Sequence, residues 1–118
     1  EPLGFLIEDG RTKERLLWAV DTANLGVTAD KLTYIAVECN YEERLLNRSD
    51  RIPSVLKDRI RHSHFEVSDV IRWLHKQDLS GVLTIWLLHL SAGNSRAEAW
   101  QVRFEREFPG IEIRVCPE

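Results

Sequence analysis

The chain has 118 residues, of which 43% are hydrophobic and 30% are charged, and its net charge at pH 7 is −3. No apolar run approaches the ~20 residues that a transmembrane helix needs, so the sequence predicts one soluble domain that does not enter a membrane. The slight acidity argues against attachment to nucleic acid by bulk charge, although individual arginines can still make local contacts.

The two cysteines, Cys39 and Cys116, are far apart in the sequence and form no Cys-x-x-Cys pair. Because no secretory leader is visible in these residues, we expect free thiols and a cytoplasmic, reducing compartment. The chain begins with Glu1 and Pro2 and runs at once into an apolar segment, so we expect it to be cut from a longer protein.

The first half of the sequence predicts three strands. Residues 3–8 and 15–20 are rich in apolar side chains, and the Asp-Gly turn signal between them indicates an antiparallel hairpin. Residues 33–39 are dense in β-branched and aromatic residues, which is typical of a buried strand.

The middle of the sequence predicts two helices. Residues 41–63 are polar and basic, and Pro53 stands where a helix could start, with apolar residues such as Leu56 and Ile60 one turn apart behind it. In residues 66–77, the apolar positions 67, 70, 71 and 74 fall on one face of an amphipathic helix, which we expect to cover a core.

The last third predicts a strand, a helix and a strand. The strand is residues 82–90, and Ser95 to Glu98 have the Ser-x-x-Glu form of a capping box at the start of the helix. Ala97, Trp100, Phe104 and Phe108 mark the buried face of that helix, and the final short strand is residues 111–116. The order β-β-β-α-α-β-α-β predicts an α/β fold with helices packed on a sheet.

Three predicted strands end in side chains that can bind metal or transfer protons. These are Asp21, Glu38 and His89. Sites gather where strands of an α/β sheet end, and a carboxylate with an imidazole suits a divalent transition metal. Structural roles compete with this interpretation: Asp21 can begin an Asx turn, Glu38 can pair with an arginine, and His89 can be a core histidine.

Two further residues have open roles. His64 stands just before a predicted helix, where either a local hydrogen bond or a catalytic proton transfer would suit it. Cys39 is interpreted as a small core residue, with a reactive nucleophile as the alternative.

The stretches EPLGFLIEDG, LLWAVDTANL, IAVECNYEERLL, HFEVSDVIRWL and LLHLSAGNS occur in this order over nearly the whole chain. Together they resemble the C-terminal half of metallo-β-lactamase-fold hydrolases, in particular the cytoplasmic phosphodiesterase and exonuclease branch related to ribonuclease Z. The resemblance implies half of an αββα sandwich as one domain, residues 1–118.

The resemblance also implies the roles of the site residues. Asp21 of the Asp-Thr motif would bridge two divalent metal ions, zinc or manganese, and His89 would ligate one of them. Ser91 and Asn94 would contact a substrate phosphate, and Glu38 with His64 would form a proton relay toward the leaving group. The implied reaction is hydrolysis of a phosphodiester, in nucleic acid or elsewhere, by water that the two ions activate.

The N-terminal half of the family fold, with its His-x-His-x-Asp-His motif, is not among these residues. We therefore expect little or no activity from this chain alone, and a bare sheet face that requires a partner. The partner would be the missing half or a second copy of the chain, as a homodimer or a domain swap. The alternatives are a non-catalytic α/β binding or assembly module, and a thioesterase-like or lactonase-like member of the same fold.

Overall fold

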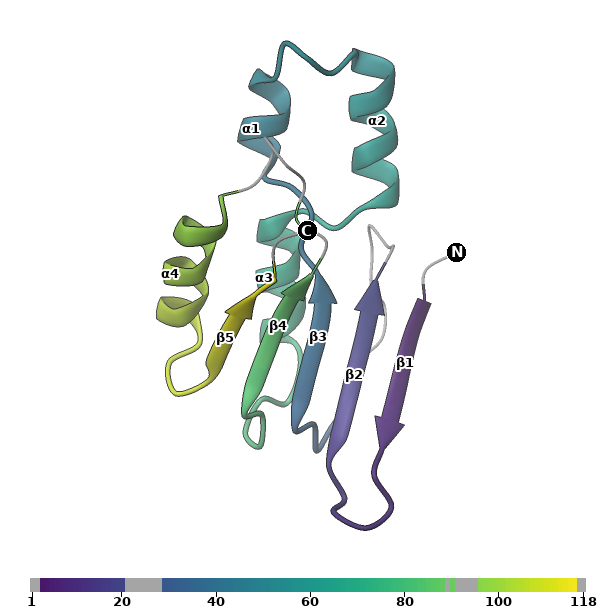
Figure 1. The fold of residues 1–118 in the computed structure, drawn as a ribbon, viewed down its shortest axis with the longest axis vertical. Coiled ribbons are helices and arrows are strands. Elements are labelled where there is room, and N and C mark those ends of the chain that lie inside the picture. Colours follow the sequence, from purple (N-terminus) through teal and green to yellow (C-terminus); the bar gives the residue numbers. More distant parts are fainter. Residues whose placement is uncertain (1–2, 21–28, 89, 91–95, 117–118) are drawn as a thin grey trace.

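The computed structural model describes residues 3–20, 29–88, 90 and 96–116. In these ranges the chain forms five strands and four helices in one mixed α/β unit, which confirms the predicted α/β class (Figure 1). The strands are β1 (Leu3–Glu8), β2 (Arg15–Val20), β3 (Tyr34–Glu38), β4 (Thr84–Leu88) and β5 (Glu112–Val115). The helices are α1 (Glu43–Arg48), α2 (Ser54–Ser63), α3 (Val67–His75) and α4 (Ala97–Glu107).

The five strands form one sheet in the order β1-β2-β3-β4-β5. The predicted hairpin is confirmed, because β1 pairs antiparallel with β2, whereas β2, β3, β4 and β5 pair in parallel. The four parallel strands consequently all end at the upper edge of the sheet in Figure 1. The carboxyl ends of the parallel strands share this edge, which is where α/β proteins usually place a site.

The hairpin turn is fixed by its first residue. The side chain of Asp9 accepts hydrogen bonds from the backbone N–H groups of Arg11 and Thr12, and these bonds lower the pKa of the Asp9 carboxyl. Lys13 closes the turn with a φ of 65°. The predicted turn signal therefore acts through an aspartate side chain that holds the backbone in a tight loop.

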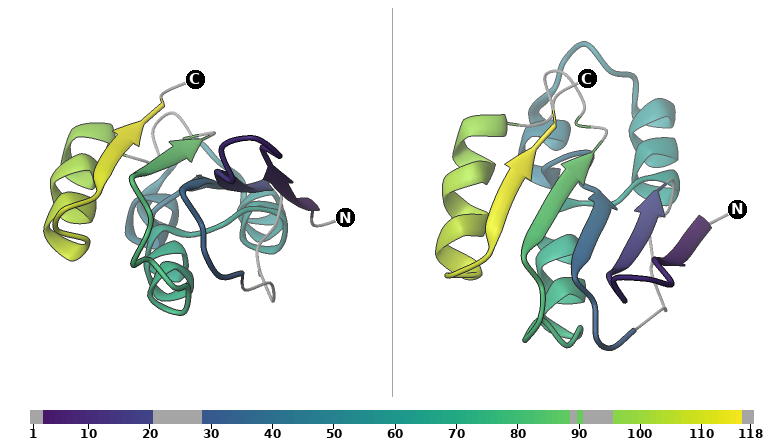
Figure 2. Two further views of the ribbon diagram at one scale, coloured as in Figure 1. Left: turned by 90° about the horizontal axis from the view of Figure 1, so that it is seen from below. Right: turned by 60° about the horizontal axis from the view of Figure 1, so that its bottom comes forward.

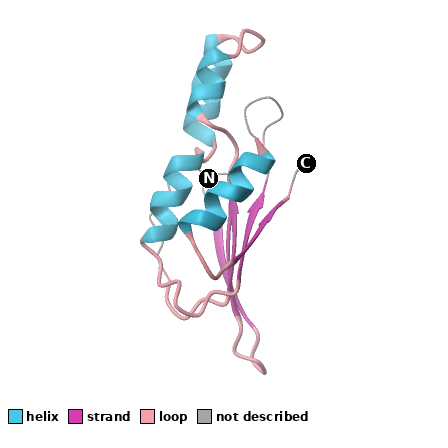
Figure 3. Ribbon diagram, turned by 90° about the vertical axis from the view of Figure 1, so that its left-hand side faces the viewer, coloured by secondary structure: helices cyan, strands magenta, loops and turns pink. Residues whose placement is uncertain are grey.

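The hydrophobic core lies between one face of the sheet and helices α3 and α4 (Figures 2 and 3). The predicted amphipathic face of α3 is confirmed, since Val67, Val70, Ile71 and Leu74 are buried against the sheet. From α4, Trp100 and Phe104 enter the same core, and Phe108 follows them. Helix α4 begins one residue later than the predicted capping box implies, because its N-cap position is Arg96. The Arg96 side chain makes no capping hydrogen bond, and the predicted cap Ser95 lies outside the described residues.

The opposite face of the sheet carries none of the described helices (Figure 3), and it is apolar across β2, β3 and β4. A shallow cavity of about 260 Å³ on this face is lined by Leu16, Trp18, Ala36, Trp86 and Leu88. The ring of Tyr34 packs against Trp86, with centroids 5.6 Å apart. This surface, which we call the open sheet face, would ordinarily be covered in a two-layered sheet protein.

The segment between β3 and α3 differs most from the sequence prediction. Residues 41–63 contain a short helix, α1, which was not predicted, as well as the predicted helix that starts after Pro53. No residue of α2 is buried, although its apolar residues have helical spacing. Both helices project beyond the edge where the parallel strands end (Figure 1). None of the helices in the described ranges is long and apolar enough to cross a membrane.

Candidate functional site

The edge where β2, β3 and β4 end is the place where the sequence predicted a site. Ala19 pairs with Val37, and Glu38 pairs with Leu88, so the three strand ends lie level with one another. Asp21 and His89 follow Val20 and Leu88 directly in the sequence. These two residues, together with Ser91 and Asn94, lie outside the described residues, and their roles stay predictions.

The structure does bring together the other two predicted site residues. Nδ1 of His64 lies 2.5 Å from Oε2 of Glu38. The Glu38 side chain is fully buried, whereas that of His64 is 34% exposed. A contact this short between the ring nitrogen and a carboxylate needs a proton between them, so Nδ1–H donates to Glu38. The imidazole is thus held by a buried carboxylate while part of its ring remains accessible.

Two backbone hydrogen bonds explain why residues so far apart in the sequence meet. The N–H of Asn40 donates to the carbonyl of Phe65, and the N–H of Val67 donates to the carbonyl of Tyr41, each at 2.9 Å. The chain that leaves β3 therefore runs alongside the chain that enters α3. The α1–α2 segment is an excursion whose two ends are bonded to each other, with Glu38 and His64 at its base.

The side chain of Glu66 links the base of the excursion to α1 and α3 through hydrogen bonds. Its Oε1 accepts the Ser68 N–H at 2.7 Å and caps α3, while its Oε2 accepts the Glu43 N–H at 3.1 Å at the start of α1. A carboxylate at helix N-termini satisfies backbone N–H groups that have no partner within the helix. Glu66 consequently fixes the direction in which α1 leaves the sheet.

Cys39, directly after Glu38, takes the core role rather than a reactive one. Its side chain is fully buried within the hydrophobic core, and burial raises the pKa of its thiol well above the ordinary value. A thiol that stays protonated is a poor nucleophile. Both cysteines are free, as expected from the sequence.

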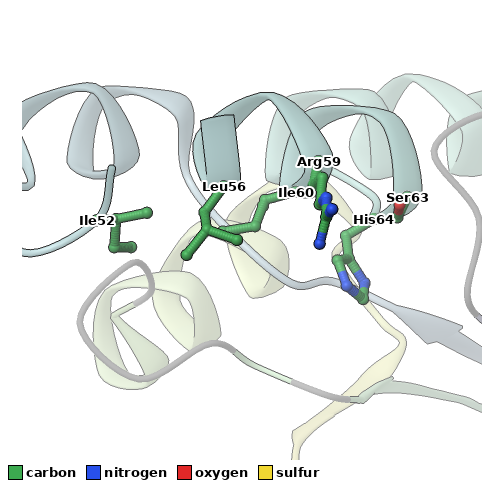
Figure 4. Close-up of a pocket in the computed structure, with 6 residues that line it drawn as sticks. All are labelled: Ile52, Leu56, Arg59, Ile60, Ser63 and His64. Atoms are coloured by element: carbon green, nitrogen blue, oxygen red, sulfur yellow. The ribbon is translucent and has the colours of Figure 1, made fainter. Parts of the chain in front are cut away.

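A groove beside His64 was not predicted from the sequence. It has a volume of about 400 Å³ and is lined by Ile52, Leu56, Arg59, Ile60, Ser63 and His64 (Figure 4). The signal was present in the sequence, because Leu56, Arg59 and Ile60 fall on one side of a helix. Helical spacing does not tell whether such a face meets the core or a ligand.

Metal binding remains a prediction. Within the described ranges, no group of three or more His, Cys, Asp and Glu side chains is arranged to hold a metal ion. Glu38 and His64 use their facing atoms for each other. The predicted ligands Asp21 and His89 follow strand ends on either side of Glu38, and a carboxylate with an imidazole is a donor set that suits zinc or manganese.

No family model matches the sequence, and no curated protein matches it. The structure is similar to the crystal structure of unliganded yeast PDE1, with a TM-score of 0.57 and 12% sequence identity. The match covers 98% of this chain and 37% of the yeast chain, so this chain spans little more than a third of that protein. Yeast PDE1 is a metallo-phosphodiesterase with a metallo-β-lactamase-type fold, and the similarity fits that type of fold without indicating a particular branch of it.

Proposed function

We propose that this chain is the C-terminal part of a metal-dependent hydrolase that cleaves phosphodiesters. The observation that carries the proposal is the contact between Glu38 and His64 at the level edge of three parallel strands. A partly exposed imidazole oriented by a buried carboxylate is an arrangement suited to general acid catalysis. The likeness in fold to a phosphodiesterase supports the choice of reaction.

In this proposal His64 donates a proton to the oxygen of the leaving alcohol. Glu38 holds the ring by accepting Nδ1–H and stabilises the positive charge of the protonated imidazole. Asp21 and His89 would hold two divalent ions, and Ser91 with Asn94 would bind the phosphate. When bound, such ions activate water and balance the charge that develops on the phosphoryl oxygens.

The open sheet face supports the view that the working protein contains more than this half. Trp18, Trp86 and Leu88 are part of an apolar surface on which none of the described helices packs. Apolar faces of sheets are normally buried against a second layer. The covering layer is the missing half of the αββα sandwich or, failing that, a second copy of this chain.

The decisive experiment compares two substrates in the complete, metal-loaded protein. His64→Ala should lower kcat by about 10²–10⁴-fold for a diester with an alkyl leaving group, which needs a proton. The same variant should change kcat little for a p-nitrophenyl diester, because p-nitrophenolate leaves without one. Asp21→Ala and His89→Ala should abolish hydrolysis of both substrates while the fold is retained.

His75→Ala is the matched control. Nε2 of His75 lies 2.8 Å from Oε1 of Glu107, which makes a second histidine–carboxylate pair, but both side chains are exposed and lie outside the site. The kcat values of His75→Ala for both substrates should equal those of the wild type. Equal losses of kcat for both substrates in His64→Ala would show that His64 is not the general acid. Absence of any hydrolysis by the wild-type protein would favour the non-catalytic module.

A further inference from the structure

The groove beside His64 is built from residues that the fold does not need for its core. Leu56 is 44% exposed, Ile52 and Ile60 are half-buried, and α2 as a whole buries no side chain. Exposing several large apolar side chains together costs free energy in water, and such grouped residues mark a surface that binds something. In Figure 4 these side chains extend from Ile52 past Leu56 and Ile60 toward the imidazole of His64.

Arg59, the arginine that lines the groove, is available to bind an anionic ligand. Arg61, two residues further along α2, is held by Glu43 at 2.8 Å and by Asp58 at 3.2 Å. Arg59 has no ion-pair partner among the described residues, and its guanidinium lies near His64 in Figure 4. An unpaired guanidinium at the rim of an apolar groove suits a ligand that is anionic at one end and apolar at the other.

We infer that this groove binds the apolar part of the leaving alcohol of a phosphodiester, an aromatic ring in particular, while Arg59 contacts the phosphate. The inference rests on the proposed function, because a general acid must stand next to the leaving oxygen. The group attached to that oxygen then has to continue past His64. His64 lines this groove, so the groove lies next to the proposed proton donor.

The size and chemistry of the groove support an aromatic group over a small polar one. A volume of about 400 Å³ lies within the range of small-molecule pockets. Three of its six lining residues, Ile52, Leu56 and Ile60, offer branched carbons that gain by excluding water from a ring, while the polar groups, Arg59, Ser63 and His64, are the remaining three. The enzyme should therefore prefer diesters of aryl or nucleoside type over those of small alcohols.

A binding titration without metal tests this inference separately from catalysis. The complete, metal-free protein is titrated by calorimetry with bis(p-nitrophenyl) phosphate and with dimethyl phosphate, which share the anion and differ in the apolar group. The aryl diester should bind at least about 10-fold more tightly, and Leu56→Gln should remove most of that preference. Arg59→Gln should weaken binding of both diesters alike.

Val55→Gln is the matched control, since Val55 is adjacent on the same helix and 66% exposed but does not line the groove. It should bind both diesters as the wild type does. Equal affinities for the two diesters, or equal effects of Leu56→Gln and Val55→Gln, would overturn the groove assignment. Because the titration requires no turnover, a failure of the proposed function would appear only in the hydrolysis experiment.

Discussion

His64 and Glu38 are in direct contact through Nδ1 and Oε2, although 26 positions separate them in the chain. The carboxylate both orients the ring and balances its charge when it carries a second proton. Because of this contact, Glu38 is proposed as a positioning residue, and its replacement should impair proton transfer by His64.

Glu38→Gln should therefore lower kcat of the complete protein by about 10–100-fold, as is usual when the partner of an essential histidine is lost. The effect should be confined to diesters with alkyl leaving groups and should leave KM nearly unchanged. Glu107→Gln, which alters the exposed pair with His75, provides the comparison. A uniform loss across substrates, or a lower melting temperature that accounts for it, would argue that Glu38 is only structural.

Trp100 should contribute to stability in two separable ways. It is 1% exposed, and its indole N–H donates to Oε1 of Glu42 at 3.0 Å. Trp100→Phe removes that donor near a buried carboxylate and should cost about 1–3 kcal/mol of unfolding free energy. Trp100→Ala should cost about 3–5 kcal/mol, because it also leaves a cavity.

Urea unfolding followed by circular dichroism measures both differences. Val102→Ala, on the same helix and 51% exposed, should change the unfolding free energy by less than about 0.5 kcal/mol. Equal costs for Trp100→Phe and Val102→Ala would mean that the hydrogen bond to Glu42 contributes nothing.

The open sheet face should determine how the chain behaves when it is isolated. Trp18 and Trp86 lie on that face on either side of Ala36 and are only partly covered. Placing Glu at both positions should lower the weight-average mass in sedimentation toward that of one chain, because a charged face resists burial. Glu at Val55 and Val102, which are exposed elsewhere, should leave the mass unchanged. The opposite pattern would place the contact outside the sheet.

Cys39 should be chemically silent in the folded protein. Burial raises the pKa of its thiol well above 9.0, so the thiol remains protonated at pH 8 and thiolate-dependent reagents cannot react with it. Cys116 is partly exposed. Ellman's reagent at pH 8 should detect one thiol per folded chain and two in denaturant, whereas rapid modification of both in native buffer would mean that the core around β3 opens.

The same shift has a consequence for stability in alkali. A thiol whose pKa is raised by folding stays neutral in the native state after the unfolded chain has begun to ionise. Its contribution is complete below the unfolded pKa near 9 and declines as pH rises above that value. Cys39→Ala should therefore reduce the loss of stability between neutral pH and alkaline pH.

The strands could be predicted from the sequence because their apolar runs are short, dense in β-branched residues and bounded by turn residues. The predicted ranges 3–8 and 15–20 are the observed β1 and β2, and the remaining three strands differ by one or two residues at their ends. The parallel order of β2 to β5 could not be read from local patterns, since it depends on crossovers that bury α3 and α4 on one face.

Helix α1 could not be predicted from local sequence patterns. Six residues of α1, rich in charge, carry little helical periodicity, and the helix is fixed instead by distant contacts such as the bond from its Glu43 N–H to Glu66. The pair of Glu38 and His64 was expected from family resemblance, and spacing alone would not have brought them together. Leu56 and Ile60 were assigned to a helix from their spacing, but the groove that they line was not predicted, because an apolar stripe that meets a groove looks the same in sequence as one that meets a core.

The excursion formed by α1 and α2 begins and ends at adjacent, mutually bonded stretches of backbone. A segment closed in this way can change its length or its side chains without moving the sheet, as surface loops with neighbouring ends generally can. The apolar groove residues Ile52, Leu56 and Ile60 lie within the excursion, whereas His64 lies at its end, next to Glu38 of the sheet. Under the proposals above, the apolar walls could therefore be exchanged while His64 and Glu38 are kept, and grafting other excursions onto this base offers a direct way to alter specificity.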